Sequence, residues 1–155
     1  VEHAIINLGG NIIVMGENPK GTPWKIGVQD PFSSRGGYMG VVSARDKTIV
    51  TSGIYERYLE QDGEVYHHIL DPETGYPAET GLAAVSIITD NSMDADGFST
   101  TLFLLGLNKG MELVKDYPEV EAIFITMDKK VYITEKLKDN FEIIDGEYVL
   151  GRTKS

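Results

Sequence analysis

The run from Leu82 to Thr89 is the most strand-like segment of the sequence, and it predicts a central strand. Other short runs rich in Val, Ile, Thr and Tyr lie on both sides of it, separated by turn residues. The predicted strands cover residues 4–8, 11–15, 24–28, 38–44, 48–51, 121–127, 130–134 and 148–150, with a further candidate at 141–144. Such closely spaced runs favour an antiparallel sheet.

Two strand pairs are predicted from the residues between the runs. Gly9 and Gly10 separate the first two runs, and a Gly-Gly turn between β-branched segments indicates a hairpin. The functional alternative is that these glycines let the backbone approach a ligand closely. Residues 38–44 and 48–51 are expected to pair around a turn at residues 45–47.

The sequence after residue 91 has the apolar spacing of an amphipathic helix, with Ser92 as its N-cap and Gly106 as its end. The apolar positions are Met93, Phe98, Leu102 and Leu105. Residues 108–117 predict a second helix, closed by Pro118. The expected fold class is therefore α+β, mainly antiparallel sheet with two consecutive helices inserted after residue 91, in a single domain over residues 1–155.

The composition excludes several classes of function. With 41% hydrophobic and 25% charged residues the chain is typical of a globular protein, and no apolar run reaches the roughly 18 residues of a membrane span. The 14 Lys and Arg against 24 Asp and Glu give a net charge of −10, which argues against nonspecific nucleic-acid binding. A phosphate-bearing substrate would need a divalent cation. The absence of cysteine excludes disulfides, thiolate zinc sites and thiol nucleophiles.

Asp96 and Thr100 form a candidate metal site. At i and i+4 on a helix they share one face, with Cβ atoms about 5–6 Å apart. A carboxylate and a hydroxyl offer the hard oxygen ligands that Mg²⁺ takes. The alternative is structural: Asp94 and Asp96 would complement the positive end of the helix dipole, and Thr100 would hydrogen-bond to the backbone.

His67 and His68 are adjacent, so on a strand they point to opposite faces and cannot both reach one site. One of them can act in general acid–base catalysis or bind a ligand, and the other is then structural or solvated. The pair is a poor metal-chelating signal. The Asp71-Pro72 turn that follows favours a functional role, because sites cluster in loops at strand ends.

Ser52 and Arg57 carry weaker signals. The segment around Ser52 lacks the Gly-x-Ser-x-Gly pattern of a nucleophile elbow, so a turn at the end of a strand is favoured over a nucleophile. Arg57 could pair with a phosphate, and the alternative is a surface ion pair with Glu56 or Glu60.

In their order and spacing these motifs resemble the ApbE family, the FAD:protein FMN transferases. The most specific match is the His-Ile-Leu-Asp-Pro-x-Thr-Gly run, and the Asp96-to-Thr100 helix start comes second. The resemblance extends from about residue 4 to residue 135. The matching stretches are residues 7–12 (NLGGNI), 24–28 (WKIGV), 52–57 (SGIYER), 68–77 (HILDPETGYP) and 95–100 (ADGFST).

This resemblance implies an ApbE-like, T-fold-like structure and Mg²⁺-dependent transfer of FMN from FAD to a Thr or Ser hydroxyl of an acceptor flavoprotein, with release of AMP. Asp96 and Thr100 match the family's Mg²⁺ ligands. His68 matches a flavin-site residue and acid–base group, and the backbone of Ile69 and Leu70 would line the isoalloxazine pocket. Mg²⁺-dependent FAD hydrolysis to FMN and AMP, and a noncatalytic flavin-binding module, are the alternatives.

Two departures from the family pattern matter. Gly97 stands where alanine is more usual, which lowers helix propensity by up to about 1 kcal/mol. The family's enzymes also have an N-terminal half that contributes to the FAD site, so this chain is expected to be a C-terminal part that binds FAD weakly and transfers poorly, or is inactive, by itself. Its first residues lack the features of a signal peptide. The resemblance implies that the full-length protein is an exported lipoprotein associated with the membrane.

Overall fold

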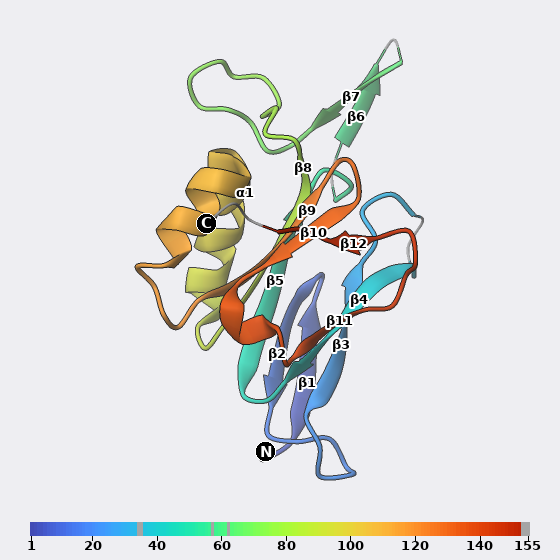
Figure 1. Cartoon of the computed structure of the whole chain (residues 1–155), viewed down its shortest axis with the longest axis vertical. Coiled ribbons are helices and arrows are strands. Elements are labelled where there is room, and N and C mark those ends of the chain that lie inside the picture. Colours follow the sequence, from blue (N-terminus) through green and yellow to red (C-terminus); the bar gives the residue numbers. More distant parts are fainter. Residues whose placement is uncertain (34–35, 57, 62, 153–155) are drawn as a thin grey trace.

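The structure is a computed structural model that describes residues 1–33, 36–56, 58–61 and 63–152, and its fold is α+β (Figure 1). The elements in chain order are β1 (Ala4–Leu8), β2 (Asn11–Met15), β3 (Trp24–Gln29), β4 (Tyr38–Ala44), β5 (Lys47–Gly53), β6 (Tyr58–Gln61), β7 (Glu64–His67), β8 (Leu82–Thr89), α1 (Ser92–Val114), β9 (Glu121–Thr126), β10 (Lys130–Ile133), the 3₁₀ helix η1 (Glu135–Leu137), β11 (Phe141–Ile143) and β12 (Val149–Leu150). The predicted α+β class with mainly antiparallel strands is confirmed.

Within the described residues the main sheet has seven strands in the order β1-β2-β5-β8-β9-β10-β12. Neighbouring strands are antiparallel except β10 and β12, which are parallel. The strand β8 lies in the middle, as predicted, and every one of its residues is buried. A strand that is buried on both faces needs a covering layer on each side of the sheet.

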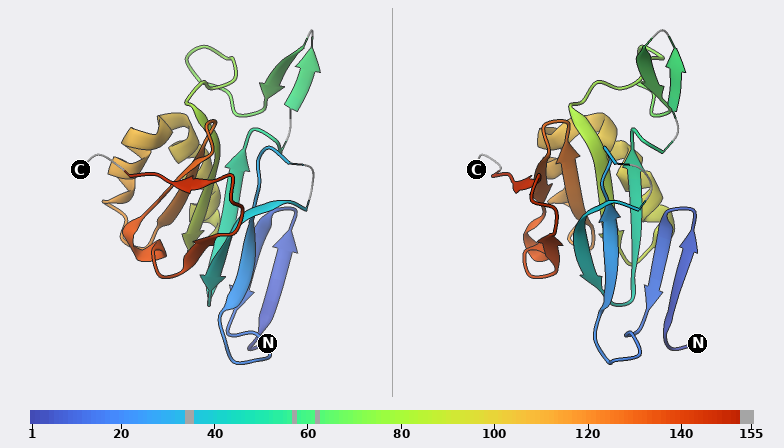
Figure 2. Two further views of the ribbon diagram at one scale, coloured as in Figure 1. Left: turned by 45° about the vertical axis from the view of Figure 1, so that its right-hand side comes forward. Right: turned by 90° about the vertical axis from the view of Figure 1, so that its right-hand side faces the viewer.

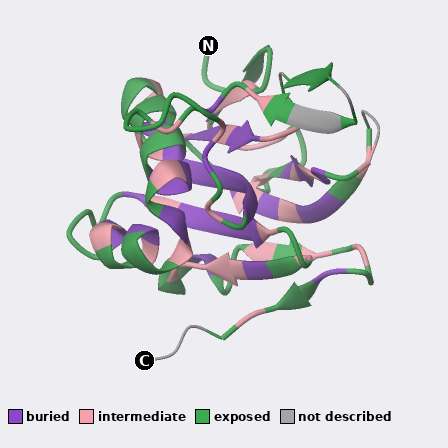
Figure 3. Cartoon of the chain, turned by 90° about the horizontal axis from the view of Figure 1, so that it is seen from above, coloured by how far each residue is buried: buried purple, intermediate pink, exposed green. Residues whose placement is uncertain are grey.

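The helix α1 covers one face of the main sheet, and a three-stranded sheet in the order β11-β4-β3 covers the other (Figures 1 and 2). Successive side chains of a strand point to opposite faces, so the side chains of β9 pack in two cores, one on each face of the main sheet. Phe124 packs in the core that contains Leu102 and Phe103 of α1, whereas Ile123 packs in the core that contains Val42 of β4. The burial colouring of Figure 3 shows that the central strands of the main sheet are buried, whereas the helix has an exposed outer side.

One helix occupies the described segment in which two were predicted, so the prediction of a second helix at 108–117 is wrong. The helix α1 continues through that segment to Val114. Gly106 has the non-helical angles φ 74° and ψ 176°, which interrupt the helical conformation at a kink between two helical stretches of α1. This region of backbone conformation is accessible almost only to glycine. The predicted stop is therefore a kink.

The helix begins one residue earlier than predicted. Asn91 is the N-cap, and its side-chain oxygen accepts a hydrogen bond from the backbone N–H of Met93 at 2.9 Å. Ser92 is already the first helical residue. Asn and Ser are about equally good N-caps, so sequence preference alone does not choose between adjacent positions.

The strands β4 and β5 do not pair with each other, which corrects the predicted strand pair. The strand β4 pairs with β3 and β11, and β5 pairs with β2 and β8 in the main sheet. Val42 of β4 and Ile49 of β5 belong to the same buried core between the two sheets. Stacking the strands face to face buries these side chains, which edge-to-edge pairing in a single sheet would leave uncovered.

The predicted hairpin at the start of the chain is confirmed. The strands β1 and β2 are antiparallel, with Leu8 opposite Asn11 across the Gly-Gly turn. The strand β1 forms one edge of the main sheet, and among the described strands only β2 pairs with it. Its apolar side chains Ile5, Ile6 and Leu8 are exposed by 45%, 41% and 69%.

The hairpin of β6 and β7 forms a separate two-stranded sheet that projects from the body of the molecule (Figures 1 and 2). All four residues of β6 are exposed, and this strand was not predicted. An exposed strand lacks the alternation of buried and solvated residues on which sequence prediction depends. The segment before the hairpin contains Glu56, and the residue after it is His68. Glu56 and His68 therefore lie at the base of the hairpin, where it joins the body of the molecule, and this base is called its root below.

Candidate functional site

A cavity of about 260 Å³ lies where segments far apart in the sequence meet. Three predicted site residues, His68, Asp96 and Thr100, line it together. The complete described lining is Leu8, Gly9, Gly10, Asn11, Val50, Thr51, Ser52, Glu56, His68, Asp96 and Thr100. The cavity thus joins the β1–β2 turn, the end of β5, the root of the β6–β7 hairpin and the start of α1.

The β1–β2 turn forms one wall of the cavity. Gly9 and Gly10 have φ angles of 68° and 111°, and a Cβ built on either would meet no other atom within 4 Å. Their backbone conformation, and not crowding, therefore requires glycine. The backbone N–H of Gly10 donates to the side-chain oxygen of Asn7 at 3.1 Å, which stabilises the turn. The turn is at once a hairpin and a backbone surface facing the cavity.

Asp96 and Thr100 lie one helical turn apart on the first part of α1, and both face the cavity. The side-chain oxygen of Thr100 lies 3.3 Å from Oγ of Ser52, so its hydroxyl is directed towards β5. Asp94 also lies in the first turn, where the helix dipole favours negative charge, but it does not line the cavity. The two acidic residues of this helix start therefore have different surroundings.

Ser52 lies within β5, opposite Val85 of β8, so the predicted turn at this position is wrong. It is 8% exposed, and its Oγ lies 2.8 Å from Oγ of Ser99 on α1. Ser99 in turn donates to the backbone oxygen of Asp96 at 2.9 Å. Residue patterns do not reveal such a contact between two serines, and the only sequence signal for Ser52 is its place in the SGIYER stretch.

The two histidines have different surroundings, as predicted. His68 lines the cavity, and its Nε2 lies 4.0 Å from Oε2 of Glu56. The ring of His67 instead packs edge-on against Phe103, with 5.8 Å between centroids. Burial is the main cause that lowers the pKa of His67. The backbone of Ala78 raises this pKa, and the charge of His68 lowers it further. Nδ1 of His67 has no hydrogen-bond partner of normal geometry among the described residues, which agrees with a neutral, packed imidazole.

Ile69 and Leu70 do not line this cavity. Ile69 is 4% exposed and belongs to the core beneath α1, whereas Leu70 is 51% exposed and forms a β-bridge with Pro77. The turn that follows is fixed by Asp71, whose carboxylate accepts from the backbone N–H of Glu73 at 2.7 Å. A contact between the backbone of Ile69 and Leu70 and a flavin stays a prediction.

The cavity is acidic. Glu56 and Asp96 contribute carboxylates, and none of the described lining residues is Lys or Arg. Burial raises the pKa of the Tyr55 hydroxyl, and the negative charge of Glu56 adds to that effect. Arg57, a candidate for pairing with a phosphate or with Glu56 or Glu60, lies outside the described residues. A diphosphate entering this cavity would meet like charge and would need a cation to offset it.

The donor set fits a magnesium ion shared with a phosphate group. Among the described residues no group of three or more His, Asp or Glu is arranged to hold a metal by itself. Mg²⁺ usually keeps several waters and binds through one or two carboxylates together with substrate phosphates. Asp96 and Thr100 supply hard oxygen atoms on one wall of a cavity, which matches this mode of binding.

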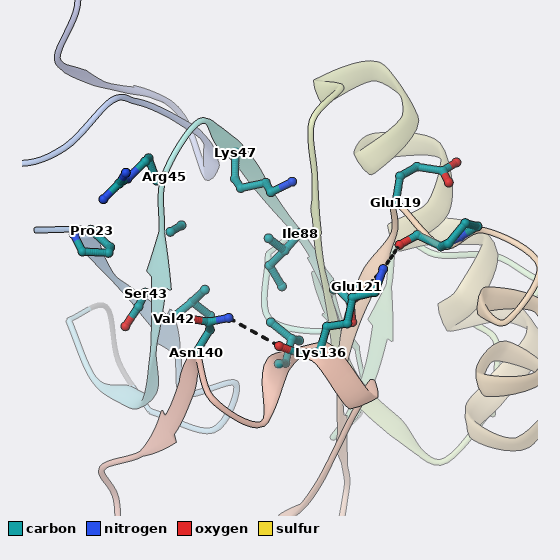
Figure 4. A pocket seen from close by; sticks show the side chains of 13 residues that line it. Pro23, Val42, Ser43, Arg45, Lys47, Ile88, Glu119, Glu121, Lys136 and Asn140 are labelled. Carbon is teal, nitrogen blue, oxygen red and sulfur yellow. Dashed lines mark hydrogen bonds and ion pairs between the residues drawn. The ribbon is translucent and has the colours of Figure 1, made fainter.

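A larger cavity of about 340 Å³ lies at the other end of β5, where Lys47 borders it, and it contains none of the predicted site residues. Arg45 pairs with Glu17, and Lys47 pairs with Asp90. Figure 4 shows the charged side chains arranged around Val42 and Ile88. Lys136, the third cation of the described lining, pairs with Glu121 at 3.7 Å. The cations that border this cavity are thus already paired with carboxylates, which disfavours an anion site there.

Comparison with known sequences gives a consistent result. The sequence profile of the ApbE family matches residues 1–124. An FAD:protein FMN transferase of Treponema pallidum (strain Nichols) is 39% identical over 160 residues, covering 98% of this chain and 44% of the relative. An FAD:protein FMN transferase of Klebsiella pneumoniae (strain 342) is 39% identical over 148 residues, covering 96% and 45%.

Solved structures agree with the sequences. The ApbE protein from Thermotoga maritima superposes with a TM-score of 0.78 at 32% identity, covering 89% of this chain and 44% of that protein. The flavin transferase ApbE from Vibrio cholerae superposes with a TM-score of 0.73 at 30% identity, covering 90% and 44%. The chain therefore spans less than half the length of these relatives.

Proposed function

This chain belongs to the ApbE family, and we propose that it carries part of a site for Mg²⁺-dependent transfer of FMN from FAD to a Thr or Ser hydroxyl of an acceptor flavoprotein. The observation that carries this proposal is the convergence of His68, Asp96 and Thr100 on one cavity beside the Gly9-Gly10 backbone. Together with the glycine turn these residues come from three separate regions of the sequence, and the cavity unites an acid–base group with oxygen donors for a cation.

The reaction breaks one phosphoanhydride bond and forms one phosphoester bond. The acceptor hydroxyl oxygen attacks the phosphorus on the FMN side of FAD, and AMP leaves with the bridging oxygen. The hydroxyl proton must be removed, and His68 is the group that we assign to this step, since it faces the cavity while His67 is packed against Phe103. Glu56, at 4.0 Å from His68, would orient the imidazole.

Asp96 and Thr100 would hold the cation against the FAD diphosphate. A bound Mg²⁺ supplies charge neutralisation at the phosphate oxygens. The protein contributes the position of the two oxygen donors on the rigid first part of α1, whose N-cap and packing on β5 and β8 fix them. The acidity of the described lining makes this neutralisation a requirement for binding a diphosphate.

The relatives are more than twice as long as this chain. We infer that the part of the relatives that this chain does not match completes the FAD site, so the 155-residue chain binds FAD weakly and transfers slowly by itself. The described residues contain no helix with the length and hydrophobicity that crossing a membrane requires. Association of the full-length protein with the membrane as an exported lipoprotein stays a prediction.

The test incubates the chain with FAD, Mg²⁺ and an acceptor protein of the Klebsiella pneumoniae relative. A parallel reaction adds, as a separate polypeptide, the portion of that relative which this chain does not match. AMP release is measured by chromatography, and covalent flavin on the acceptor is measured by its fluorescence in a denaturing gel. Mg²⁺-dependent AMP release together with a fluorescent acceptor supports the proposal.

Other outcomes distinguish the alternatives. AMP with free FMN and an unlabelled acceptor indicates hydrolysis, in which water replaces the acceptor hydroxyl. FAD that binds and stays intact in the presence of Mg²⁺ indicates a noncatalytic flavin-binding module. Failure to bind FAD with and without the added portion contradicts the proposed function.

A further inference from the structure

Three side-chain hydroxyls form a chain from the cavity into the core. Oγ1 of Thr100, which lines the cavity, lies 3.3 Å from Oγ of Ser52. Oγ of Ser52 lies 2.8 Å from Oγ of Ser99, and Oγ of Ser99 lies 2.9 Å from the backbone oxygen of Asp96. The chain of contacts thus starts at one predicted metal ligand and ends on the backbone of the other.

The direction of every hydrogen bond in this chain follows from its last member. A carbonyl oxygen can only accept, so Ser99 must donate its single proton to Asp96. Ser99 then has no proton left for Ser52, so Ser52 donates to Ser99. Ser52 has in turn used its only proton, so it can only accept from Thr100. The proton of Thr100 therefore points towards Ser52, into the protein.

Water cannot easily reverse this order. Ser99 is fully buried at 0% exposure, so its hydroxyl cannot exchange its partner for solvent. Ser52 borders the cavity but is only 8% exposed, so solvent has little access to its hydroxyl. Thr100 itself is exposed to the cavity. Its oxygen has two lone pairs, and with its proton held by Ser52 both of them are available on the cavity side.

We propose that Ser52 and Ser99 are positioning residues that hold the Thr100 oxygen as an acceptor-only ligand for a divalent cation in the cavity. The inference rests on the proposed function, because it assigns the cation to Asp96 and Thr100. A hydroxyl that turned its proton outward would oppose a cation, whereas the order of donors from Thr100 to Asp96 excludes that orientation. Residues that orient metal ligands from behind typically change metal affinity roughly 10- to 100-fold when they are removed.

The test uses the 155-residue chain and has two readouts that do not depend on catalysis. Backbone amide shifts of Asp96 and Thr100 in an NMR titration with MgCl₂ give the midpoint of cation binding, and this method also measures weak binding. Three-bond couplings to the Thr100 methyl carbon report its χ1 rotamer in the absence of any metal.

Ser52→Ala removes the acceptor for the Thr100 proton. The hydroxyl of Thr100 is then expected to turn towards a carbonyl of the preceding helical turn, which gives a second χ1 rotamer in the couplings. The Mg²⁺ midpoint is expected to rise roughly tenfold, at the lower end of the range for such partners. Ser52→Thr retains a hydroxyl and is expected to recover most of the affinity.

Ser99→Ala separates proton order from simple packing. It keeps the contact between Ser52 and Thr100 but frees the Ser52 proton, which can then point at Thr100 and turn the Thr100 proton outward. The proposal expects weaker Mg²⁺ binding in this variant also. The matched control is Thr48→Val, which removes a buried hydroxyl of the same strand that donates to the backbone oxygen of Ile12 at 3.1 Å and does not line the cavity, and it should leave the midpoint unchanged.

The outcomes are distinct. If wild-type amides respond to Mg²⁺ but Ser52→Ala has the same midpoint and the same Thr100 couplings, the positioning role is overturned and the proposed function stands. If wild-type amides do not respond to Mg²⁺, the metal assignment of the proposed function is overturned. If Ser52→Ala does not fold, Ser99→Ala decides, and a midpoint equal to that of wild type overturns the proton order.

Discussion

Nε2 of His68 lies 4.0 Å from Oε2 of Glu56, and these residues stand at the two roots of the projecting β6–β7 hairpin. The hairpin thus brings an imidazole and a carboxylate together at the edge of the cavity. A histidine that lies beside a carboxylate in the lining of a cavity is an arrangement suited to removing a proton from an entering hydroxyl.

Substitution of His68 tests this arrangement. His68→Gln keeps the polarity and approximate size of the side chain but cannot take up a proton, so FMN transfer is expected to fall by roughly 10²- to 10⁴-fold. The measurement is covalent flavin on the acceptor over time, in the presence of the complementing polypeptide. His67→Gln is the matched control, since His67 packs against Phe103, and it should retain transfer. Equal losses in both variants would argue against a specific role for His68.

The acidic start of α1 offers a second matched pair. Asp96→Asn removes a carboxylate from the cavity, whereas Asp94→Asn removes one from the same exposed helix start but outside the cavity. Mg²⁺ affinity is expected to fall at least roughly tenfold for Asp96→Asn and to change little for Asp94→Asn. Isothermal titration with MgCl₂ and FAD measures the difference. Similar affinities in the two variants would show that general negative charge, and not a ligand, attracts the cation.

The kink of α1 makes a prediction about stability. Gly106→Ala places a Cβ on a residue with φ 74° and ψ 176°, which is expected to lower the free energy of unfolding by about 1–3 kcal/mol. Gly97→Ala lies in the regular part of the same helix, where a Cβ meets nothing within 4 Å, and it should raise that free energy by about 0.5–1 kcal/mol. Urea unfolding followed by circular dichroism measures both. A neutral Gly106→Ala would mean that the helix straightens without cost.

The half-buried imidazole of His67 predicts a pH dependence of stability. Burial lowers its pKa in the folded chain below the ordinary 6.5, so the unfolded chain binds more protons in this range. Its contribution to stability is therefore present above about pH 6.5 and is lost as the pH falls through the lower folded pKa. His67→Phe, which keeps an aromatic ring against Phe103, should show a smaller loss of stability than wild type between pH 7.5 and 5.0. Urea midpoints at the two pH values give the comparison, and parallel curves would contradict it.

The sequence predicted the elements whose pattern is set by burial. Leu82 to Thr89 reads as a central strand because most of its residues are apolar, and all of its residues are buried in β8. It did not predict how β4 and β5 are arranged, because local residue patterns favour a strand in either arrangement. The choice between pairing and stacking depends on the layers that cover Val42 and Ile49. Local propensity favoured Ser92 as the N-cap, and it does not distinguish Ser92 from the adjacent Asn91 that caps the helix.

The candidate site could be predicted where a motif fixed the residues. His68, Asp96 and Thr100 were expected from the sequence, and the structure brings them to one cavity, although their roles stay predictions. Ser52 was expected in a turn, and its place in the site was not predicted. That place depends on a contact with Ser99, which lies 47 positions away in the sequence. A hydrogen bond between distant hydroxyls has no periodic signature in a sequence.

The exposed edge strand β1 has a consequence for the behaviour of the protein in solution. Ile5, Ile6 and Leu8 offer an apolar strand whose outer edge no described strand covers, which is a template for pairing between copies. The net charge of −10 opposes such pairing through mutual repulsion. Salt shortens the reach of that repulsion, from about 10 Å at 0.1 M to about 3 Å at 1 M. Dilute buffers should therefore keep the chain monomeric, and concentrated salt should favour self-association and aggregation.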